Sequence, residues 1–174
     1  SAKYKISNKL TLGLESESGK KTDDIGFLQK KDGEIHFGRR DINSVENSLD
    51  LNFNIDNYKY LSLRFRNFWS TANYDNVLFS LKNDGMRELT DHSKLDFDPN
   101  TNFNLWNLDL NFDWWFSPGS TITLQYKNQI FNRDDQSALN YYKSLKNLFE
   151  IPIEHQLSLR VNYLIDFNKL RRND

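Results

Sequence analysis

Alternation of apolar and polar residues at every second position is the feature that most constrains this chain. Residues 104–131, NLWNLDLNFDWWFSPGSTITLQYKNQIF, carry it on both sides of a short turn. Successive side chains of a β-strand point to opposite faces of a sheet. The period therefore predicts antiparallel strands that have one apolar face and one polar face.

The alternation predicts about six long strands in a meander. Phe (13), Tyr (8) and Trp (4) make 14% of the chain aromatic, which favours strands. Residues 140–152, NYYKSLKNLFEIP, are compatible with a short helix or an extra hairpin and stay unassigned. The strands are expected over residues 3–16, 34–55, 59–81, 102–116, 120–131 and 155–168.

The connections between these strands alternate in kind. Residues 56–58 and 117–119 are tight turns rich in turn-forming residues, whereas the links over 16–33, 82–101 and 132–154 are long and polar. Short turns at one end and long loops at the other are typical of an outer-membrane barrel. The apolar stretches run for about 9–11 residues, the length that a tilted strand needs to cross the hydrocarbon. The predicted fold class is all-β, a portion of an antiparallel transmembrane β-barrel with short periplasmic turns and long extracellular loops.

The aromatic residues predict which face meets lipid. A lipid-facing wall carries aromatic girdles at both interfaces. We therefore expect the apolar face to point outward and the polar face to line the lumen. The girdle residues are Trp114, Phe116, Phe53 and Phe167 near the short turns and Trp69, Trp106 and Phe131 toward the loops.

This orientation assigns two sets of residues. The predicted lipid-facing residues are Leu49, Leu51, Phe53, Leu61, Leu63, Phe65, Leu108, Leu110, Phe112, Trp114, Leu124, Leu159, Val161 and Tyr163. The predicted lumen-lining residues are Glu46, Asp50, Arg64, Arg66, Asp109, Asp113, Lys127, Arg160 and Asp166.

The tight turns also predict a register. If Ile55 pairs with Lys59, Asp50 falls opposite Arg64, and Asn47 falls opposite Asn67 on the apolar face. The analogous pairing of Phe116 with Ser120 places Asp109 opposite Lys127. Opposite charges on neighbouring strands help to fix the register of a sheet.

Charge and residue usage exclude several kinds of site. Lys plus Arg (23) nearly balances Asp plus Glu (24), so no attraction to nucleic acid is expected, and the absence of Cys excludes disulfides and thiol nucleophiles. His36, His92 and His155 lie in separate segments without the spacing of metal ligands, so no metal, cofactor or catalytic residue is predicted. The basic cluster GRRD, residues 38–41, is expected to form salt bridges with nearby Asp and Glu; contact with lipopolysaccharide phosphates is the alternative.

The strand count predicts partners. Single-chain outer-membrane barrels have at least eight strands, and open sheet edges are not tolerated in lipid. We therefore expect residues 1–174 to form one unit that completes a barrel with strands from upstream sequence, another chain or an outer-membrane complex.

Three functions remain open from the residues. The favoured hypothesis is a non-enzymatic segment of a bacterial outer-membrane barrel that contacts outer-membrane lipid and acts as a membrane anchor, pore wall or subunit of a complex. The first alternative is a soluble lipocalin-like barrel, in which the same alternation points inward around an apolar ligand. The second is an outer-membrane enzyme with its site in loops or in missing sequence.

Several stretches resemble one protein family. They are DDIGFLQKKDGEIHFGRRDINSVENSLDLNFNI, LRFRNFWS, FNLWNLDLNFDWWFSPGSTITLQYKNQIF and LSLRVNYLIDFNKL, which together cover nearly the whole chain. They resemble the end of large Bacteroidetes outer-membrane proteins in which a domain similar to carbohydrate-binding family 9 precedes a C-terminal region of unknown function. The resemblance implies the C-terminal barrel portion of a longer protein and a link to glycan handling. It implies no catalytic residues.

Overall fold

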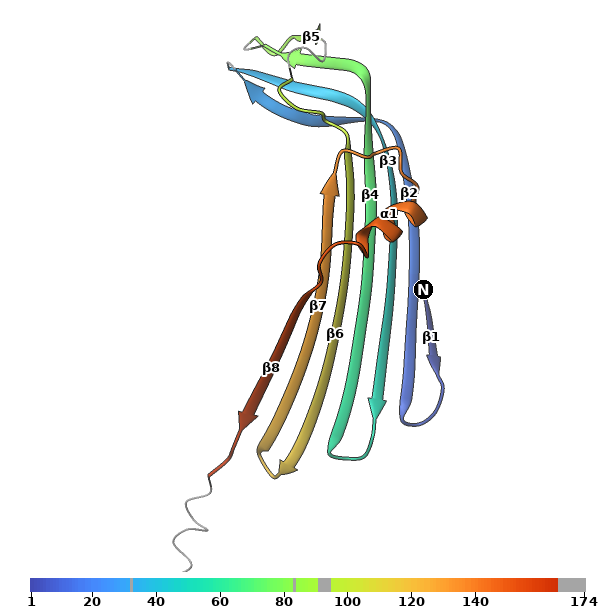
Figure 1. The fold of residues 1–174 in the computed structure, drawn as a ribbon, viewed down its shortest axis with the longest axis vertical. Coiled ribbons are helices and arrows are strands. Elements are labelled where there is room, and N and C mark those ends of the chain that lie inside the picture. The colour runs from blue at the N-terminus through green and yellow to red at the C-terminus, as the bar shows by residue number, and fades with distance from the viewer. Residues whose placement is uncertain (32, 83, 91–94, 166–174) are drawn as a thin grey trace, which may run out of the picture.

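The computed structural model describes residues 1–31, 33–82, 84–90 and 95–165. These residues form one antiparallel sheet of eight strands in the order β1-β2-β3-β4-β6-β7-β8, with β5 paired to β4 (Figure 1). The sheet is a single layer that does not close into a barrel, so β1 and β8 are its edges. The elements are β1 (Ala2–Lys5), β2 (Leu10–Lys31), β3 (Glu34–Asn54), β4 (Lys59–Leu81), β5 (Arg87–Thr90), β6 (Thr101–Ser117), β7 (Ser120–Asp134), α1 (Tyr141–Leu148) and β8 (Glu154–Asn162).

The expectation of an all-β antiparallel fold is confirmed, but the first predicted strand is wrong. Residues 3–16 form a hairpin in which Tyr4 of β1 pairs with Leu12 of β2. The turn forms because the Ser7 hydroxyl accepts hydrogen bonds from the backbone N–H groups of Lys9 (3.1 Å) and Leu10 (3.0 Å). Such local hydroxyl bonds are a common way for Ser to form a turn.

Two of the links expected to be irregular contain regular structure. β2 continues to Lys31 and stays paired with β3 up to Glu34, so the 16–33 link is mostly strand. The unassigned segment forms the short helix α1, with Asn140 as its N-cap. β8 ends at Asn162, and the last three residues of the strand predicted over 155–168 lie outside the described residues.

The predicted register holds across the long strands. Asp50 pairs with Arg64, Asn47 pairs with Asn67, and Asp109 pairs with Lys127. At the second turn, however, Ser117 rather than Phe116 pairs with Ser120, because a bulge falls between residues 115 and 117. The turn is Pro118–Gly119, and Gly119 has a φ of 73°, as the third position of a type II turn requires.

The upper end of the sheet bends sharply (Figure 1). The β2–β3 register shifts between Lys21 and Asp24, and the β3–β4 register shifts between Gly38 and Arg40. Because Asp24 pairs with Arg40, both shifts lie at the same level of the sheet. Bulges bend a strand and increase its twist. The bend therefore follows from bulges placed side by side.

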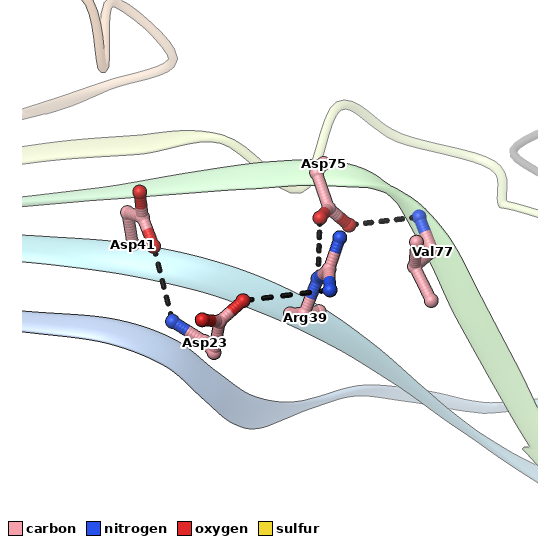
Figure 2. A network of polar contacts seen from close by, with 5 residues as sticks. All are labelled: Asp23, Arg39, Asp41, Asp75 and Val77. Carbon is pink, nitrogen blue, oxygen red and sulfur yellow. Dashed lines mark hydrogen bonds and ion pairs between the residues drawn. The ribbon is translucent and has the colours of Figure 1, made fainter.

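Acidic residues around Arg39 hold these bulges (Figure 2). The Arg39 guanidinium contacts the carboxylates of Asp75 at 2.6 Å and Asp23 at 3.4 Å. Asp23 has a φ of 56°, and its N–H donates to the Asp41 carboxylate, while Asp75 also accepts from the N–H of Val77. The hydrogen bond and the negative charge of Asp75 raise the pKa of Arg39. The expected salt bridges of the GRRD cluster are thus present.

The bend carries the β2–β3 hairpin over the polar face of the sheet. Gly26 and Gly38 lie opposite each other in this hairpin, and a Cβ on Gly38 would lie 2.6 Å from the Tyr74 ring. The Arg40 guanidinium donates to the Tyr74 hydroxyl at 2.9 Å, and its Nε to Asp24 at 2.8 Å. A hollow of about 510 Å³ lies beneath, lined by residues of the hairpin, of β4, of the segment 97–101 and of the upper end of β7.

The described part of the chain has almost no hydrophobic core. Its buried apolar side chains are Trp69, Leu78, Ile130 and Leu148. A sheet with so little buried apolar area draws little stability from its own packing, because burial of apolar area is the dominant favourable term in folding.

Candidate functional site: the two faces of the sheet

One face of the sheet carries an apolar belt. Partners directly across strands share a face, so the pairing places the belt residues in three successive rows. Many remain open to solvent: Leu124 is 40% exposed, Leu159 is 66% exposed and Leu157 is 71% exposed. The rows are Leu10, Phe53, Leu61, Phe112, Leu124 and Leu159; Leu12, Leu51, Leu63, Leu110, Tyr126 and Leu157; and Leu14, Leu49, Phe65 and Leu108.

The residues predicted to face lipid all belong to this side of the sheet. Most lie in the three rows, and Trp114 and Val161 lie in the row directly below, nearest the short turns. Tyr163 follows the end of β8 and stacks on Phe116, with 6.2 Å between the ring centroids. The sequence thus assigned these side chains to a common face; the predicted set omitted Leu10, Leu12, Leu14, Tyr126 and Leu157, which complete the rows.

The opposite face carries a charged row at mid-height of the belt. Asp50, Arg64, Asp109 and Lys127 follow one another across four strands, so their charges alternate in sign. Arg64 contacts Asp50 at 2.6 Å, and Lys127 contacts Asp109 at 3.5 Å. Each cation therefore has a carboxylate beside it, which stabilises this register.

The polar face is hollowed. A cavity of about 650 Å³ is lined by residues from β1 to β7, including all four members of the charged row. Just below, the Gln125 amide donates to Asn111 at 2.7 Å and Thr123 donates to Asp113 at 2.6 Å, two contacts that sequence reasoning did not identify. Of the predicted lumen-lining residues, Glu46, Asp50, Arg64, Arg66, Asp109, Asp113, Lys127 and Arg160 share this face, whereas Asp166 lies outside the described residues.

Above the belt, aromatic residues lie on the polar face and amide side chains lie on the belt side. On the polar face an aromatic cluster forms from Phe68, Phe103 and Phe131, with ring centroids 5.8 Å and 5.4 Å apart. Phe131 pairs with Leu105, so its predicted place in the girdle of the apolar face, beside Trp106, is wrong. Ile130 and Phe131 are both apolar, and only the pairing with β6 decides which of them belongs to which face.

On the belt side, the rows above the belt hold an amide network of Asn47, Asn67, Asn102 and Asn104. Three of these amides, Asn67, Asn102 and Asn104, are fully buried. The Asn67 amide donates to Asn104 Oδ1 at 3.0 Å, and Trp69 Nε1 donates to Asn102 Oδ1 at 3.0 Å. The side-by-side placement of Asn47 and Asn67 near the end of the apolar face was predicted; the wider network was not.

The helix α1 covers the amide network. The Tyr141 hydroxyl donates to Asn67 Oδ1 at 2.8 Å and accepts from Asn47 Nδ2 at 3.0 Å. Ser144 Oγ donates to Asn102 Oδ1 at 2.9 Å and accepts from Asn104 Nδ2 at 3.2 Å. Buried amides need such partners, so α1 completes the hydrogen bonding of this part of the sheet. Burial raises the pKa of the Tyr141 hydroxyl.

Neither of the two histidines that the structure describes, His36 and His155, belongs to the charged row or to the amide network. His36 is 2% exposed and sits opposite Ser80, but its Nδ1 has no hydrogen-bond partner among the described residues. The Ser80 hydroxyl instead donates to Glu34 at 2.7 Å, so it is not oriented as a nucleophile activated by His36. His155 Nδ1 contacts the Tyr126 hydroxyl at 2.8 Å, and His92 lies outside the described residues.

Comparison with known proteins places the chain in a family. The model of a domain of unknown function, DUF5916, matches residues 1–173. The chain belongs to the DUF5916 family. This confirms the part of the resemblance that pointed to an uncharacterised family. No curated protein and no solved structure matches the chain.

The described residues of this DUF5916 domain hold no group of three or more His, Cys, Asp or Glu side chains that could bind a metal ion. They also include no helix that is long and apolar enough to cross a membrane. The candidate site is the pair of faces described above, the apolar belt and the hollowed polar face with its charged row.

Proposed function

We propose that this chain forms part of the wall of a β-barrel in the bacterial outer membrane, where it serves as a membrane anchor, pore wall or subunit of an outer-membrane assembly without catalytic activity of its own. The apolar belt contacts lipid and the hollowed polar face lines the lumen. The observation that carries the proposal is the uncovered apolar belt directly behind the charged row.

The height of the belt supports this proposal. Trp106 and Trp114 share one face of β6 and bracket the three rows. Eight residues of an antiparallel strand span about 27 Å. A strand tilt of about 40° reduces this to a height of roughly 21 Å, close to the roughly 25 Å apolar band of outer-membrane barrels. Trp side chains at both ends are what interfacial girdles require.

The charged row supports the same orientation. In the reverse orientation Arg64 and Lys127 would meet lipid near the middle of the band, where each cation costs about 2–4 kcal/mol. Inside a wet lumen the same groups keep both their water and their partners Asp50 and Asp109. The proposed orientation also stabilises the inserted protein, because each aliphatic side chain of the belt that moves from water to hydrocarbon contributes about 1.5–3 kcal/mol.

The free edges explain why further strands belong to the proposal. β1 pairs only with Thr11–Leu14 of β2, so the rest of that edge of β2 has no strand beside it in the described sheet, and neither does the outer edge of β8. Unpaired backbone groups in lipid cost several kcal/mol each. We therefore include partner strands, from upstream sequence or another chain, at both edges.

The soluble alternative fits the exposed belt less well. A lipocalin-like barrel would bury Leu157, Leu159 and Val161 in a closed interior, whereas these side chains are 57–71% exposed on a single-layer sheet. The Bacteroidetes source and the link to glycan handling come from the sequence resemblance, and they enter the proposal on that basis.

Site-directed spin labelling tests the proposal, and the absence of Cys from the chain leaves no background label. Leu124→Cys and Gln125→Cys form a matched pair, because adjacent residues of β7 point to opposite faces. In the native protein in liposomes, the label at Leu124 should be accessible to oxygen and the label at Gln125 to a water-soluble nickel chelate. Equal accessibility, or the reverse, would refute the orientation.

Two simpler measurements address the alternatives. A protein that stays monomeric in buffer without detergent would favour the soluble barrel. A hydrolase screen with His36→Ala and His155→Ala, each compared with the unaltered protein, addresses the enzyme hypothesis; an activity that either substitution abolishes would contradict the proposal of a non-catalytic wall.

A further inference from the structure

The helix α1 lies on the belt side of the sheet at the level where the belt ends. Its hydrogen bonds reach Asn47 on β3, Asn67 on β4 and Asn104 on β6, so it crosses three neighbouring strands, as Figure 1 shows. The helix therefore lies at the upper border of the belt that the proposed function places in lipid. This inference rests on the proposed function.

The sequence gives α1 three distinct sides. At 100° per residue, Tyr141, Ser144 and Leu148 share the side that packs against the sheet. Tyr142, Leu145 and Phe149, the C-cap residue, follow one another on one flank. Lys143 and Asn147 occupy the other flank, and Lys146 points away from the sheet.

The apolar flank is continuous with the belt. The Phe149 ring packs 4.9 Å from the ring of Trp106, which lies in the row directly above the belt. Phe149 is nevertheless 49% exposed and Tyr142 is 79% exposed. The flank therefore adds exposed aromatic area to the upper border of the apolar surface, where an interfacial girdle lies.

The charges on the helix fit a lipid surface. Residues 137–149 include Lys143 and Lys146 and no acidic residue. A helix with an apolar flank and lysines on its polar side, at the border of a lipid-facing belt, has the pattern of an interfacial helix, whose lysines extend toward anionic headgroups.

From these observations we infer that α1 is an interfacial helix of the outer leaflet. Tyr142, Leu145 and Phe149 rest at the boundary between acyl chains and headgroups, and Lys143 and Lys146 contact lipid phosphates. The hydrogen bonds of Tyr141 and Ser144 tie the helix to the wall, so α1 fixes the depth at which the barrel sits.

Spin labels at Phe149 and Asn147 test this inference in the native protein in liposomes, with the label at Leu124 as the reference. The two positions lie on opposite flanks of the same helix end. The ratio of oxygen to nickel-chelate accessibility should be several-fold higher at Phe149 than at Asn147 and lower than at Leu124. This corresponds to a depth of about 5–10 Å.

The outcomes separate the inference from the proposal beneath it. A water-like ratio at Leu124 would refute the proposed function. A hydrocarbon-like ratio at Leu124 with equal, water-like ratios at Phe149 and Asn147 would overturn the interfacial helix alone. Protection of both helix positions from both reagents would identify a protein partner instead of lipid, and would also overturn it.

A second experiment tests the lysines. The Phe149 label is compared in liposomes of phosphatidylcholine alone and of phosphatidylcholine mixed with phosphatidylglycerol. The anionic lipid should raise its accessibility ratio, and the pair Lys143→Glu and Lys146→Glu should abolish that rise. The control pair, Lys20→Glu and Lys21→Glu on exposed β2, should retain it. No rise with anionic lipid, or equal loss in both pairs, would overturn the role of the lysines.

Discussion

Replacing Tyr141 by Phe isolates the contribution of one hydroxyl to the docking of α1. The Tyr141 hydroxyl is the donor to Asn67 Oδ1 and the acceptor from Asn47 Nδ2. Asn67 is 1% exposed, and its Nδ2 is held by its bonds to Asn104 and Leu105. Because the hydroxyl of Tyr141 is the donor to Asn67 Oδ1, the substitution would leave this buried oxygen without a partner. Leaving a buried acceptor unpaired costs about 1–3 kcal/mol.

The assay is hydrogen exchange of the α1 amides in the native protein, read by mass spectrometry on peptides spanning residues 139–151. Helix opening governs this exchange, and each 1.4 kcal/mol changes the open population tenfold. A cost of about 1–3 kcal/mol therefore predicts exchange roughly 5- to 150-fold faster in Tyr141→Phe, with β6 and β7 unchanged.

Tyr142→Phe is the matched control. Tyr142 is the next residue, is 79% exposed, and its hydroxyl makes no hydrogen bond to any described residue. A surface change of this kind alters stability by less than about 0.5 kcal/mol. If Tyr141→Phe exchanged as slowly as Tyr142→Phe, the amide network would not hold the helix, and the account of this part of the wall would be wrong.

Two further predictions concern the belt and the bend. Leu110→Arg should lower the stability of the folded protein in liposomes by about 2–4 kcal/mol in a urea titration, because the charge enters the middle of the belt. Ser62→Arg, on the polar face in the row next to Leu110, should have little effect, and equal effects would contradict the orientation. Gly38→Ala should destabilise the protein by about 1–3 kcal/mol in the same titration, since its Cβ would lie 2.6 Å from the Tyr74 ring, whereas Gly13→Ala, with its nearest neighbour at 3.6 Å, should be neutral or slightly stabilising. Loss of stability in both glycine variants would show that the crowding at Tyr74 is not the cause.

Much of the lower sheet was predictable because its signals are local. A period of two is visible in any short window, and the lengths of the turns at residues 56–58 and 117–119 fix which residues of the flanking strands pair. This is why Asp50 opposite Arg64 and Asp109 opposite Lys127 were predicted and found. At the second turn the bulge shifts the pairing of Phe116 alone, and the rest of the register is unaffected.

The upper sheet was less predictable because apolar and polar residues do not alternate regularly along its strands. From Glu15 to Lys21, β2 alternates polar with polar residues, so no apolar period marks it as a strand, and only its pairing with β3 makes it one. The bend depends on Arg39 meeting Asp75, which lies 36 positions away in sequence. No local pattern contains that contact.

The sequence by itself determined that the chain forms long antiparallel strands with one apolar and one polar face, since alternation and turn chemistry act between near neighbours. The tertiary structure decided where that contrast ends. Phe131 belongs to the aromatic cluster and α1 covers the amide network because Asn47 and Tyr141, 94 positions apart, meet only after the strands between them have paired.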